Sequence, residues 1–411
     1  MNAQFASARK DFSILHTKVH GQPLIYLDNA ATTQVPNPVL NAVMQQYHCH
    51  QANVHRGIHT LSEQSTARME EAREHMRRFL GAHLPEEIIF TSGTTQSINL
   101  VARSLSFGML RDGDEIIVTE LEHHANLIPW QEACRRTGAV LRVIPVTQSG
   151  ELDLTAFERL LSHKTKLLAT AWVSNVTGTV NPLEDMIKLA HEAGAWVLVD
   201  GAQAVRHMHL EVAILNCDFF CLSGHKMMGP TGTGILYGKK EILEQMPPDT
   251  FGGGMVNQVT AHAASYDVLP FRLEAGTPNI AGNIGLGAAA DYLDRLGRNN
   301  IAAWEDELLQ YVVGGLASRP YIEILGKPAR RAGCVSFNLK GAHPFDVARL
   351  LDQLGVAVRS GHHCAQPLLT ALACKGAVRV SPAFYNTKVE LDQFFAALDR
   401  IARILRRRGE K

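Results

Sequence analysis

Short apolar runs rich in β-branched residues recur between residues 87 and 237, and helix-length segments separate most of them. The runs cover residues 87–91, 115–119, 140–145, 166–172, 196–200, 217–223 and 233–237. Buried strands that alternate with amphipathic helices are typical of parallel sheets covered by helices on both faces. We therefore expect an α/β fold with a seven-stranded, mostly parallel sheet. The last two runs are joined by a short Gly-rich stretch, which favours an antiparallel pair at the sheet edge.

The pattern changes near residue 295. A long amphipathic stretch is followed by strand-like runs at 334–339, 356–359 and 377–381, with helical patterns at 345–354 and from about 388 onwards. A chain of 411 residues is also long for one small core. We expect residues 21–294 to form a large domain, and residues 295–411 to form a smaller α+β domain joined by residues 1–20.

Composition and charge narrow the classes of function. The 40 Lys and Arg residues balance 40 Asp and Glu residues, which argues against nucleic acid as the main partner. No apolar segment approaches the roughly 20 residues of a membrane span, and the first residues lack the apolar stretch of a signal peptide. Seven cysteines without an export signal predict a reduced, cytoplasmic protein.

Two polar clusters each close an apolar run. They are Asp200-Gly-Ala-Gln203 and Ser223-Gly-His-Lys226, and in such sheets ligands bind at the carboxyl ends of the strands. A lysine amine can condense with the aldehyde of pyridoxal 5'-phosphate (PLP). A neighbouring acid can keep the pyridine nitrogen protonated, so that the ring accepts electrons. Lys226 and Asp200 therefore predict a PLP site.

A hydroxyl-rich turn supplies a candidate phosphate site. Thr91-Ser-Gly-Thr94-Thr95 follows a strand and opens a helix, and its glycine, hydroxyls and free helical N–H groups suit an anion. An ordinary helix cap would have the same pattern, but the nearby lysine and acid favour phosphate. Ser223 and His225 are further phosphate donors.

His123 follows the run at 115–119, again at the carboxyl end of a strand. An imidazole there can stack on a flat cofactor ring and move protons. A structural histidine is the alternative, and the other features of the site favour the cofactor contact.

Cys364 lies in a loop bounded by Gly and Pro, beside two histidines and an arginine. An electropositive setting favours the thiolate. Zinc binding is one alternative, although the adjacent His362, His363 and Cys364 make poor chelate geometry. A buried structural cysteine is another, and the polar loop favours a mobile nucleophile over both.

Arg379 lies within the strand-like run at 377–381. A buried guanidinium can bind a substrate carboxylate at two points. A structural ion pair is the alternative.

Taken together, these residues resemble the group II cysteine desulfurases, the SufS and selenocysteine-lyase type of class V aminotransferases with PLP fold type I. The similarity runs over nearly the whole length. Its motifs include Tyr26-Leu-Asp-Asn-Ala-Ala31, Val54-His-Arg-Gly-Ile-His59, Glu122-His-His-Ala-Asn126, Ser174-Asn-Val-Thr-Gly178, Glu274-Ala-Gly-Thr-Pro-Asn279 and Arg359-Ser-Gly-His-His-Cys-Ala-Gln-Pro367, besides those at 92–95, 200–203 and 223–226.

The resemblance implies a role for each matching residue. Lys226 binds PLP as a Schiff base, His123 stacks on the ring and Cys364 accepts the sulfur. The other cofactor contacts that it implies are Thr94, Thr95, Asn175, Asp200, Gln203, Ser223 and His225, with Thr277 from the partner subunit of a homodimer. Arg379 is the main ligand of the substrate carboxylate, with Arg359 and Asn175 beside it. No metal is expected.

The expected reaction is conversion of L-cysteine to L-alanine with a persulfide on Cys364, for iron–sulfur cluster assembly. The resemblance also implies L-selenocysteine as a substrate, and a SufE- or SufU-like acceptor with a SUF scaffold. A PLP-dependent aminotransferase or β-lyase without a persulfide is the alternative within the fold. A non-enzymatic sulfur carrier or metal-binding scaffold is the alternative from another class.

Overall fold

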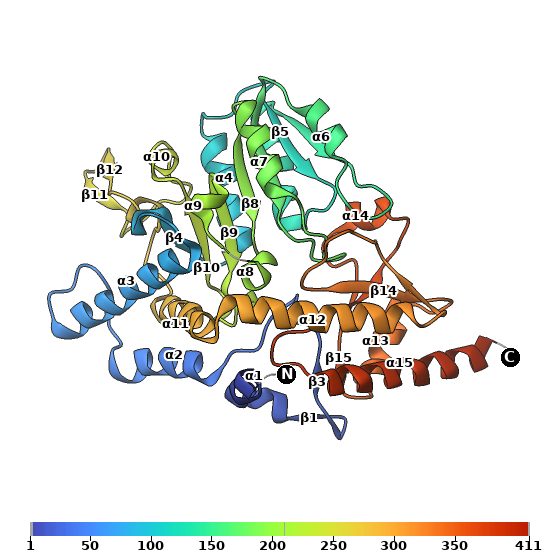
Figure 1. Ribbon diagram of the computed structural model, residues 1–411. Helices are drawn as coiled ribbons and strands as arrows, with labels where there is room; N and C mark the ends of the chain where they lie inside the picture. Colours follow the sequence, from blue (N-terminus) through green and yellow to red (C-terminus); the bar gives the residue numbers. More distant parts are fainter. Residues whose placement is uncertain (1–2, 209, 410–411) are drawn as a thin grey trace.

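A seven-stranded sheet forms the centre of the molecule in the computed structural model, which describes residues 3–208 and 210–409 (Figure 1). The strand order is β4-β10-β9-β8-β7-β5-β6. Each strand coincides with one predicted run: β4 Ile88–Thr91, β5 Glu115–Thr119, β6 Val140–Ile144, β7 Thr165–Ala171, β8 Trp196–Asp200, β9 Phe219–Ser223 and β10 Gly234–Gly238. Neighbours from β9 to β6 are parallel, so the mostly parallel sheet is confirmed.

The predicted antiparallel pair is present but does not lie at the sheet edge. β10 is antiparallel to β9 on one side and to β4 on the other, so β4 is the edge strand. Gly234 makes this insertion sterically possible, because a Cβ there would lie 2.4 Å from the Cα of Gly93. The expectation of an edge pair was wrong because the run at 87–91 pairs with a strand distant in sequence.

Helices cover both faces of the sheet because alternate strand side chains point to opposite sides. Val197 and Val199 of β8 pack in one core, and Leu198 packs in the other. The first core contains α3 Thr60–Leu80, α7 Leu183–Glu192, α11 Ile280–Leu296 and α12 Arg298–Ala317, with the short helices α6 Leu154–Leu160, α8 Ala204–His207 and α9 Val212–Leu215. The second contains α4 Thr94–Ser106, α5 Ile128–Thr137 and α10 Lys240–Leu243.

A smaller antiparallel sheet follows α12, which runs from below the central sheet to the small sheet in Figure 1. Its order is β13-β14-β17-β16, with β13 Ile322–Ile324, β14 Val335–Leu339, β16 Arg359–Gly361 and β17 Ala377–Val380. The accompanying helices are α13 Pro344–Asp352, α14 Gln366–Ala371 and α15 Lys388–Gly409. This segment has the α+β content that the sequence indicates, and the domain boundary at residue 295 stays a prediction.

The N-terminal segment lies against this C-terminal unit. It begins with α1 Ala3–Ala8 and the hairpin β1 Lys18–Val19 and β2 Gln22–Pro23, and β3 Ile25–Tyr26 then pairs in parallel with β15 Val356–Ala357. Asp28 forms a further bridge to Ser381. These pairings bring residues near 28 to the end of β17.

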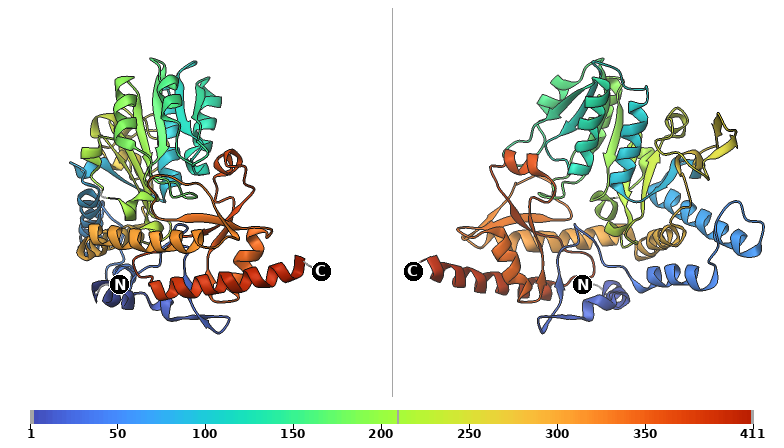
Figure 2. Two further views of the ribbon diagram at one scale, coloured as in Figure 1. Left: turned by 45° about the vertical axis from the view of Figure 1, so that its right-hand side comes forward. Right: turned by 180° about the vertical axis from the view of Figure 1, so that it is seen from behind.

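Two elements project from one side of the body. They are α2 Asn37–Cys49 and the hairpin of β11 Val256–Val259 and β12 Ala264–Tyr266 (Figure 2). Both carry exposed apolar side chains, among them Leu40, Met44, Tyr47, Val259 and Tyr266. Within the described residues, no helix combines the length and apolarity needed to cross a bilayer.

Candidate active site

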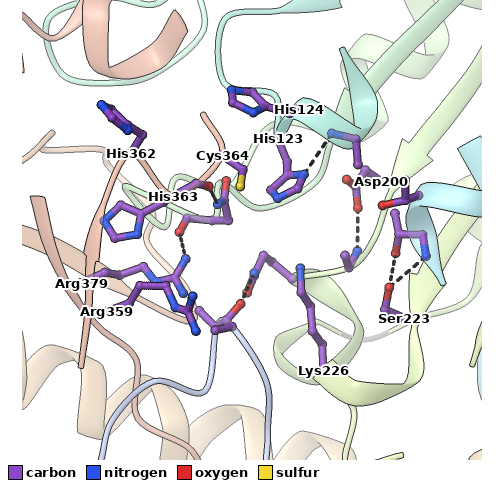
Figure 3. Close-up of a pocket in the computed structure, with 18 of the residues that line it drawn as sticks. His123, His124, Asp200, Ser223, Lys226, Arg359, His362, His363, Cys364 and Arg379 are labelled. Atoms are coloured by element: carbon purple, nitrogen blue, oxygen red, sulfur yellow. Dashed lines mark hydrogen bonds between the residues drawn. The ribbon is translucent and has the colours of Figure 1, made fainter. Parts of the chain in front are cut away.

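A cavity of about 560 Å³ opens at the carboxyl ends of β8 and β9, facing the small sheet (Figure 3). Side chains from both sheets line it, although they come from distant parts of the chain. The predicted site residues that it brings together are Thr94, Thr95, His123, Asn175, Asp200, Gln203, Ser223, His225, Lys226, Arg359, Cys364 and Arg379. Cavities of this size hold small cofactors and their substrates.

Lys226 ends the 3-10 turn η5 Gly224–Lys226, directly after β9. Burial lowers the pKa of Lys226, and the nearby Asp200 carboxylate opposes that shift. Burial also raises the pKa of Asp200, which accepts a hydrogen bond of 2.9 Å from the amide of Ala202. A buried amine and a buried acid therefore face one cavity, where each is exposed to the other's charge.

The first turn of α4 forms a cradle beside these groups. The amide and the hydroxyl of Thr94 each lie 2.9 Å from the Ser223 hydroxyl. Gly93 precedes the helix at a φ of 145°, and a Cβ there would lie 3.2 Å from that same hydroxyl. A glycine is thus required where the loop passes the end of β9. The hydroxyls and the helix N-terminus give the cavity one end suited to an anion.

His123 points into the cavity (Figure 3). Its Nδ1 accepts a hydrogen bond of 3.0 Å from the amide of Ala125, which leaves the proton on Nε2. Burial, followed by the charge of Lys226, lowers the pKa of His123 to about 4. The imidazole is therefore neutral near pH 7.

Glu122 holds the loop after β5, which carries His123, in place. It was not among the predicted site residues. The buried carboxyl group accepts hydrogen bonds from the Thr119 hydroxyl at 2.7 Å, the Asn126 side-chain amide at 2.6 Å and the Ala171 main chain at 3.0 Å. Burial raises the pKa of Glu122 to about 8. An acid that directly precedes two histidines at a strand end is the signal that could have found it.

Arg359 and Arg379 lie side by side, paired in register on β16 and β17 (Figure 3). Arg379 is buried and donates from Nη1 to the carbonyl of Asn175 at 2.8 Å. Both guanidinium groups also contact Asp28, which sequence reasoning did not single out. The alternative for Arg379 was a structural ion pair. Its contact of 3.4 Å with Asp28 is an ion pair of that kind.

Cys364 is exposed and lies in the loop after β16. Both His363 and Cys364 have left-handed backbones, with φ of 53° and 55°. Such geometry costs energy for residues other than glycine and persists only where neighbours enforce it. Here the side-chain amide of Asn175 donates a hydrogen bond of 2.6 Å to the main-chain carbonyl of His363. The main-chain amide of His124 donates one of 2.7 Å to the main-chain carbonyl of Cys364.

This geometry excludes a buried structural cysteine at position 364. His363 is buried instead, with Nε2 hydrogen-bonded to the carbonyl of Ala377 at 2.9 Å. Burial lowers the pKa of His363 to about 3. Among the described residues, no group of three or more His, Cys, Asp or Glu side chains is arranged to hold a metal ion.

Thr277 is the one predicted site residue that this chain does not bring to the cavity. It lines a separate hollow of about 220 Å³ with Ser92, Gln96 and Glu274. Ser92 and Gln96 flank Thr94 and Thr95 in the chain, so the hollow and the cavity adjoin the same turn.

Comparison with known proteins decides the family. The family described as Aminotransferase class-V matches residues 25–394. A cysteine desulfurase of Cronobacter sakazakii is 49% identical over 98% of this chain and 100% of its own. One from Escherichia coli is 49% identical over 97% of this chain and 98% of its own. The chain belongs to the cysteine desulfurases of the class-V aminotransferase family.

Solved structures of cysteine desulfurases share the fold. CsdA from Escherichia coli, in an S-sulfonic acid form, has a TM-score of 0.91 and 39% identity, covering 98% of this chain and 99% of its own. The apo enzyme from Thermococcus onnurineus has a TM-score of 0.92 and 39% identity, covering 97% and 98%. The predicted resemblance and the PLP fold type I are confirmed.

As a cysteine desulfurase, the protein is a PLP-dependent enzyme, as the sequence predicts. The residues of the cavity fit that cofactor. A buried amine with a lowered pKa suits its aldehyde, a buried acid suits its pyridine nitrogen, and the cradle of Thr94 and Ser223 suits its phosphate.

Proposed function

We propose that this cysteine desulfurase converts L-cysteine to L-alanine and carries the released sulfur as a persulfide on Cys364. The observation that carries the proposal is that Cys364 and Lys226 line the same cavity, although they come from different sheets. An aminotransferase or β-lyase would give the strained, exposed cysteine no role.

Substrate binding begins at the arginines. The proposed ligand of the substrate carboxylate is Arg379, because its Nε is buried and has no hydrogen-bond partner among the described residues. An unpaired buried donor is costly, and a carboxylate oxygen would satisfy it. The main-chain carbonyl of Asn175 orients this guanidinium group by accepting a hydrogen bond from Nη1 of Arg379.

Lys226 then acts as the base. Burial lowers the pKa of Lys226, which favours the neutral amine that can take the proton from the substrate Cα. PLP, when bound, supplies an electron sink for the charge that this proton leaves behind. Asp200 contributes a buried carboxylate that favours a positive ring nitrogen.

Cys364 performs the sulfur transfer. Its thiolate attacks the substrate sulfur, so that an S–S bond forms while the Cβ–S bond of the substrate breaks. The electron pair of the broken bond stays with the carbon fragment, which gains protons to become alanine. The transferred sulfur remains on Cys364 until a thiol accepts it. His123, neutral and oriented by Ala125, can donate from Nε2 within the cavity.

The assembly is proposed to be a homodimer. Support comes from the exposed apolar side chains on α2 and the projecting hairpin, because such surfaces usually mark an interface. Support also comes from Thr277, which lies away from the cavity of its own chain. In a dimer, the partner subunit's Thr277 would complete the phosphate cradle.

The acceptor is proposed to be a small SufE- or SufU-like protein that serves a SUF scaffold for iron–sulfur cluster assembly. The exposure of Cys364 supports transfer to another protein. A cytoplasmic location is proposed because the reaction needs a reduced thiol, and every described cysteine is free. L-Selenocysteine is proposed as a second substrate.

Product analysis tests the proposal. Purified protein is incubated with L-cysteine and a thiol reductant, and alanine, sulfide and 2-oxo acids are measured. We expect alanine and sulfide in equal amounts. Formation of a 2-oxo acid without alanine would instead indicate an aminotransferase or β-lyase. Mass spectrometry without reductant should find one extra sulfur atom on Cys364, and none on the exposed Cys49, which serves as an internal control.

A further inference from the structure

Asp28 lies between the two arginines of the cavity and contacts both. Its Oδ2 accepts hydrogen bonds from Arg359, from Nη2 at 2.9 Å and from Nε at 3.1 Å. Its Oδ1 lies 3.4 Å from Nη2 of Arg379. Asp28 is 9% exposed, whereas the Arg359 side chain is half exposed, so the carboxylate itself is sheltered from solvent.

The backbone around Asp28 holds the carboxylate in this position. Asp28 forms a parallel bridge with Ser381, two residues beyond Arg379. The amide of Ser381 donates to the carbonyl of Leu27 at 2.8 Å, and the amide of Ala30 donates to the Ser381 hydroxyl at 2.8 Å. The carboxylate is therefore fixed to the same sheet end as the arginines, which limits its freedom to move away.

Asp28 engages the two arginines unequally. Arg359 makes short contacts through two nitrogens, and hydrogen bonding to Asp28 raises the pKa of its guanidinium. Arg379 makes one long contact, while its buried Nε has no partner among the described residues. Nε and Nη2 form one edge of the guanidinium, and a carboxylate can bind that edge at two points. The edge of Arg379 is thus available to a ligand, whereas that of Arg359 is occupied by Asp28.

The same geometry sets the balance of charge at this end of the cavity. Two guanidinium groups carry two positive charges, and the Asp28 carboxylate offsets one of them. A substrate carboxylate offsets the other. A second negative charge on the substrate would then enter a cavity with no spare cation at this end, since Asp28 occupies Arg359.

We propose that Asp28 is a positioning residue that keeps Arg359 engaged and leaves Arg379 to bind the substrate, so that the site prefers amino acids with a single negative charge. Asp28 thereby sets the charge class of the substrate without touching the reacting atoms. This inference rests on the proposed function, because it assigns the amino-acid carboxylate to this cavity.

A pair of nearly isosteric ligands isolates the charge. L-Asparagine and L-aspartate differ at one side-chain group, which is neutral in the first and negative in the second. Their dissociation constants from the holoenzyme are measured by titration calorimetry and, separately, as inhibition constants against L-cysteine turnover. In the unaltered enzyme we expect L-asparagine to bind more tightly than L-aspartate.

Asp28→Asn keeps the shape and removes the charge. The ratio of the L-aspartate constant to the L-asparagine constant should fall by about tenfold, because Arg359 becomes available to the second carboxylate. Arg359→Gln should move the ratio the opposite way, because Asp28 then repels the additional negative charge. In the double variant Asp28→Asn/Arg359→Gln, the effect of Asp28→Asn should largely disappear, as coupling between the two residues requires.

Asp218→Asn is the matched control. Asp218 is also buried and paired with a cation, Lys239, but it does not line the cavity, so its loss should leave the ratio unchanged. An unchanged ratio in both Asp28→Asn and Arg359→Gln would overturn the inference and make the contact purely structural. Calorimetry keeps this outcome separate from failure of the proposed function, which would appear as absence of alanine production by the unaltered enzyme.

Discussion

The main-chain amide of His124 donates a hydrogen bond of 2.7 Å to the carbonyl of Cys364. This bond joins the loop after β5 of the central sheet to the loop after β16 of the small sheet. The side chain of His124 reinforces it, because Nε2 accepts from the amide of Gln366 at 3.3 Å. The loop that carries the proposed nucleophile is thus fastened to the sheet that carries Lys226.

Removing the His124 side chain should loosen this fastening. His124→Ala deletes the acceptor for Gln366, so Cys364 should spend less time in the cavity. We expect kcat for L-cysteine to fall about two- to tenfold, the size of one net hydrogen bond, while KM changes little. Alkylation of Cys364 by iodoacetamide should become faster. His362→Ala, at an exposed histidine of the same loop, is the control, and equal effects of both variants would contradict this role.

Cys364→Ser tests the persulfide step. The serine hydroxyl cannot form an S–S bond, so we expect L-cysteine turnover to drop by at least a hundredfold, while the visible absorption of bound PLP is retained. Cys374→Ser changes a half-buried cysteine of the same unit and should keep nearly full activity. Full activity of Cys364→Ser on L-cysteine would contradict the proposed mechanism.

Lys226→Ala tests the cofactor linkage. Without the amine, PLP lacks a covalent attachment to the protein, so the lysine-linked visible absorption should disappear and alanine production should cease. Lys239 lies at the opposite end of the β9–β10 pair and pairs with Asp218 outside the cavity, so Lys239→Ala should retain both signals. Absorption spectra and alanine assays on the two variants decide the point, and a Lys226→Ala enzyme that still turns over L-cysteine would refute it.

Buried histidines should make the fold sensitive to acid. His123 and His225 have pKa values of about 4, and His363 has a pKa of about 3, mainly because burial disfavours their charged forms. In the unfolded chain these histidines are protonated near pH 6.5, whereas in the folded chain they stay neutral until about pH 4. The free energy of unfolding therefore decreases as the pH falls from about 6.5 towards 4. Each such histidine lowers the free energy of unfolding by about 1.4 kcal/mol per pH unit in that window.

Thermal unfolding between pH 7.5 and 4.5 checks this expectation. His363→Asn should flatten the dependence by the share of one histidine, whereas His262→Asn, at an exposed position of the projecting hairpin, should not. Stability that stays constant from pH 6.5 to 4.5 would show that these groups do not resist protonation.

Dimer formation should be coupled to cofactor retention. If the partner subunit's Thr277 completes the phosphate cradle, Thr277→Val should weaken PLP binding by about tenfold or more, the size of a hydrogen bond to a charged group. Met44→Glu and Tyr47→Glu, on exposed positions of α2, should produce monomers that lose PLP in the same way. Light scattering and visible absorption report the two quantities. A monomeric variant that keeps PLP as tightly as the unaltered enzyme would contradict the coupling.

Local sequence patterns predicted the central sheet well. The runs at 115–119 and 196–200 match β5 and β8 at both ends, because strands buried on both faces are continuously apolar and end at polar residues. The sequence placed β10 at the edge, because it contains no local signal that the run at 87–91 returns to pair with it. Asp28 was missed for a related reason. A single acid at the end of a short run has no pattern, and its partners become visible only when distant segments meet. Glu122 did have a local signal in the two histidines that follow it, but its partner Ala171 comes from another strand.

The amino-acid sequence alone determined the strand and helix periods and the chemical groups at the ends of the strands, including Lys226, Asp200 and Cys364. These properties follow from spacing along the chain and from residue type. Tertiary structure alone decided which of those groups share a cavity, that Asp28 contacts both Arg359 and Arg379, and that Thr277 lies outside the cavity. Contacts of this kind depend on the packing of segments far apart in sequence, and burial then sets the charges that make the residues reactive.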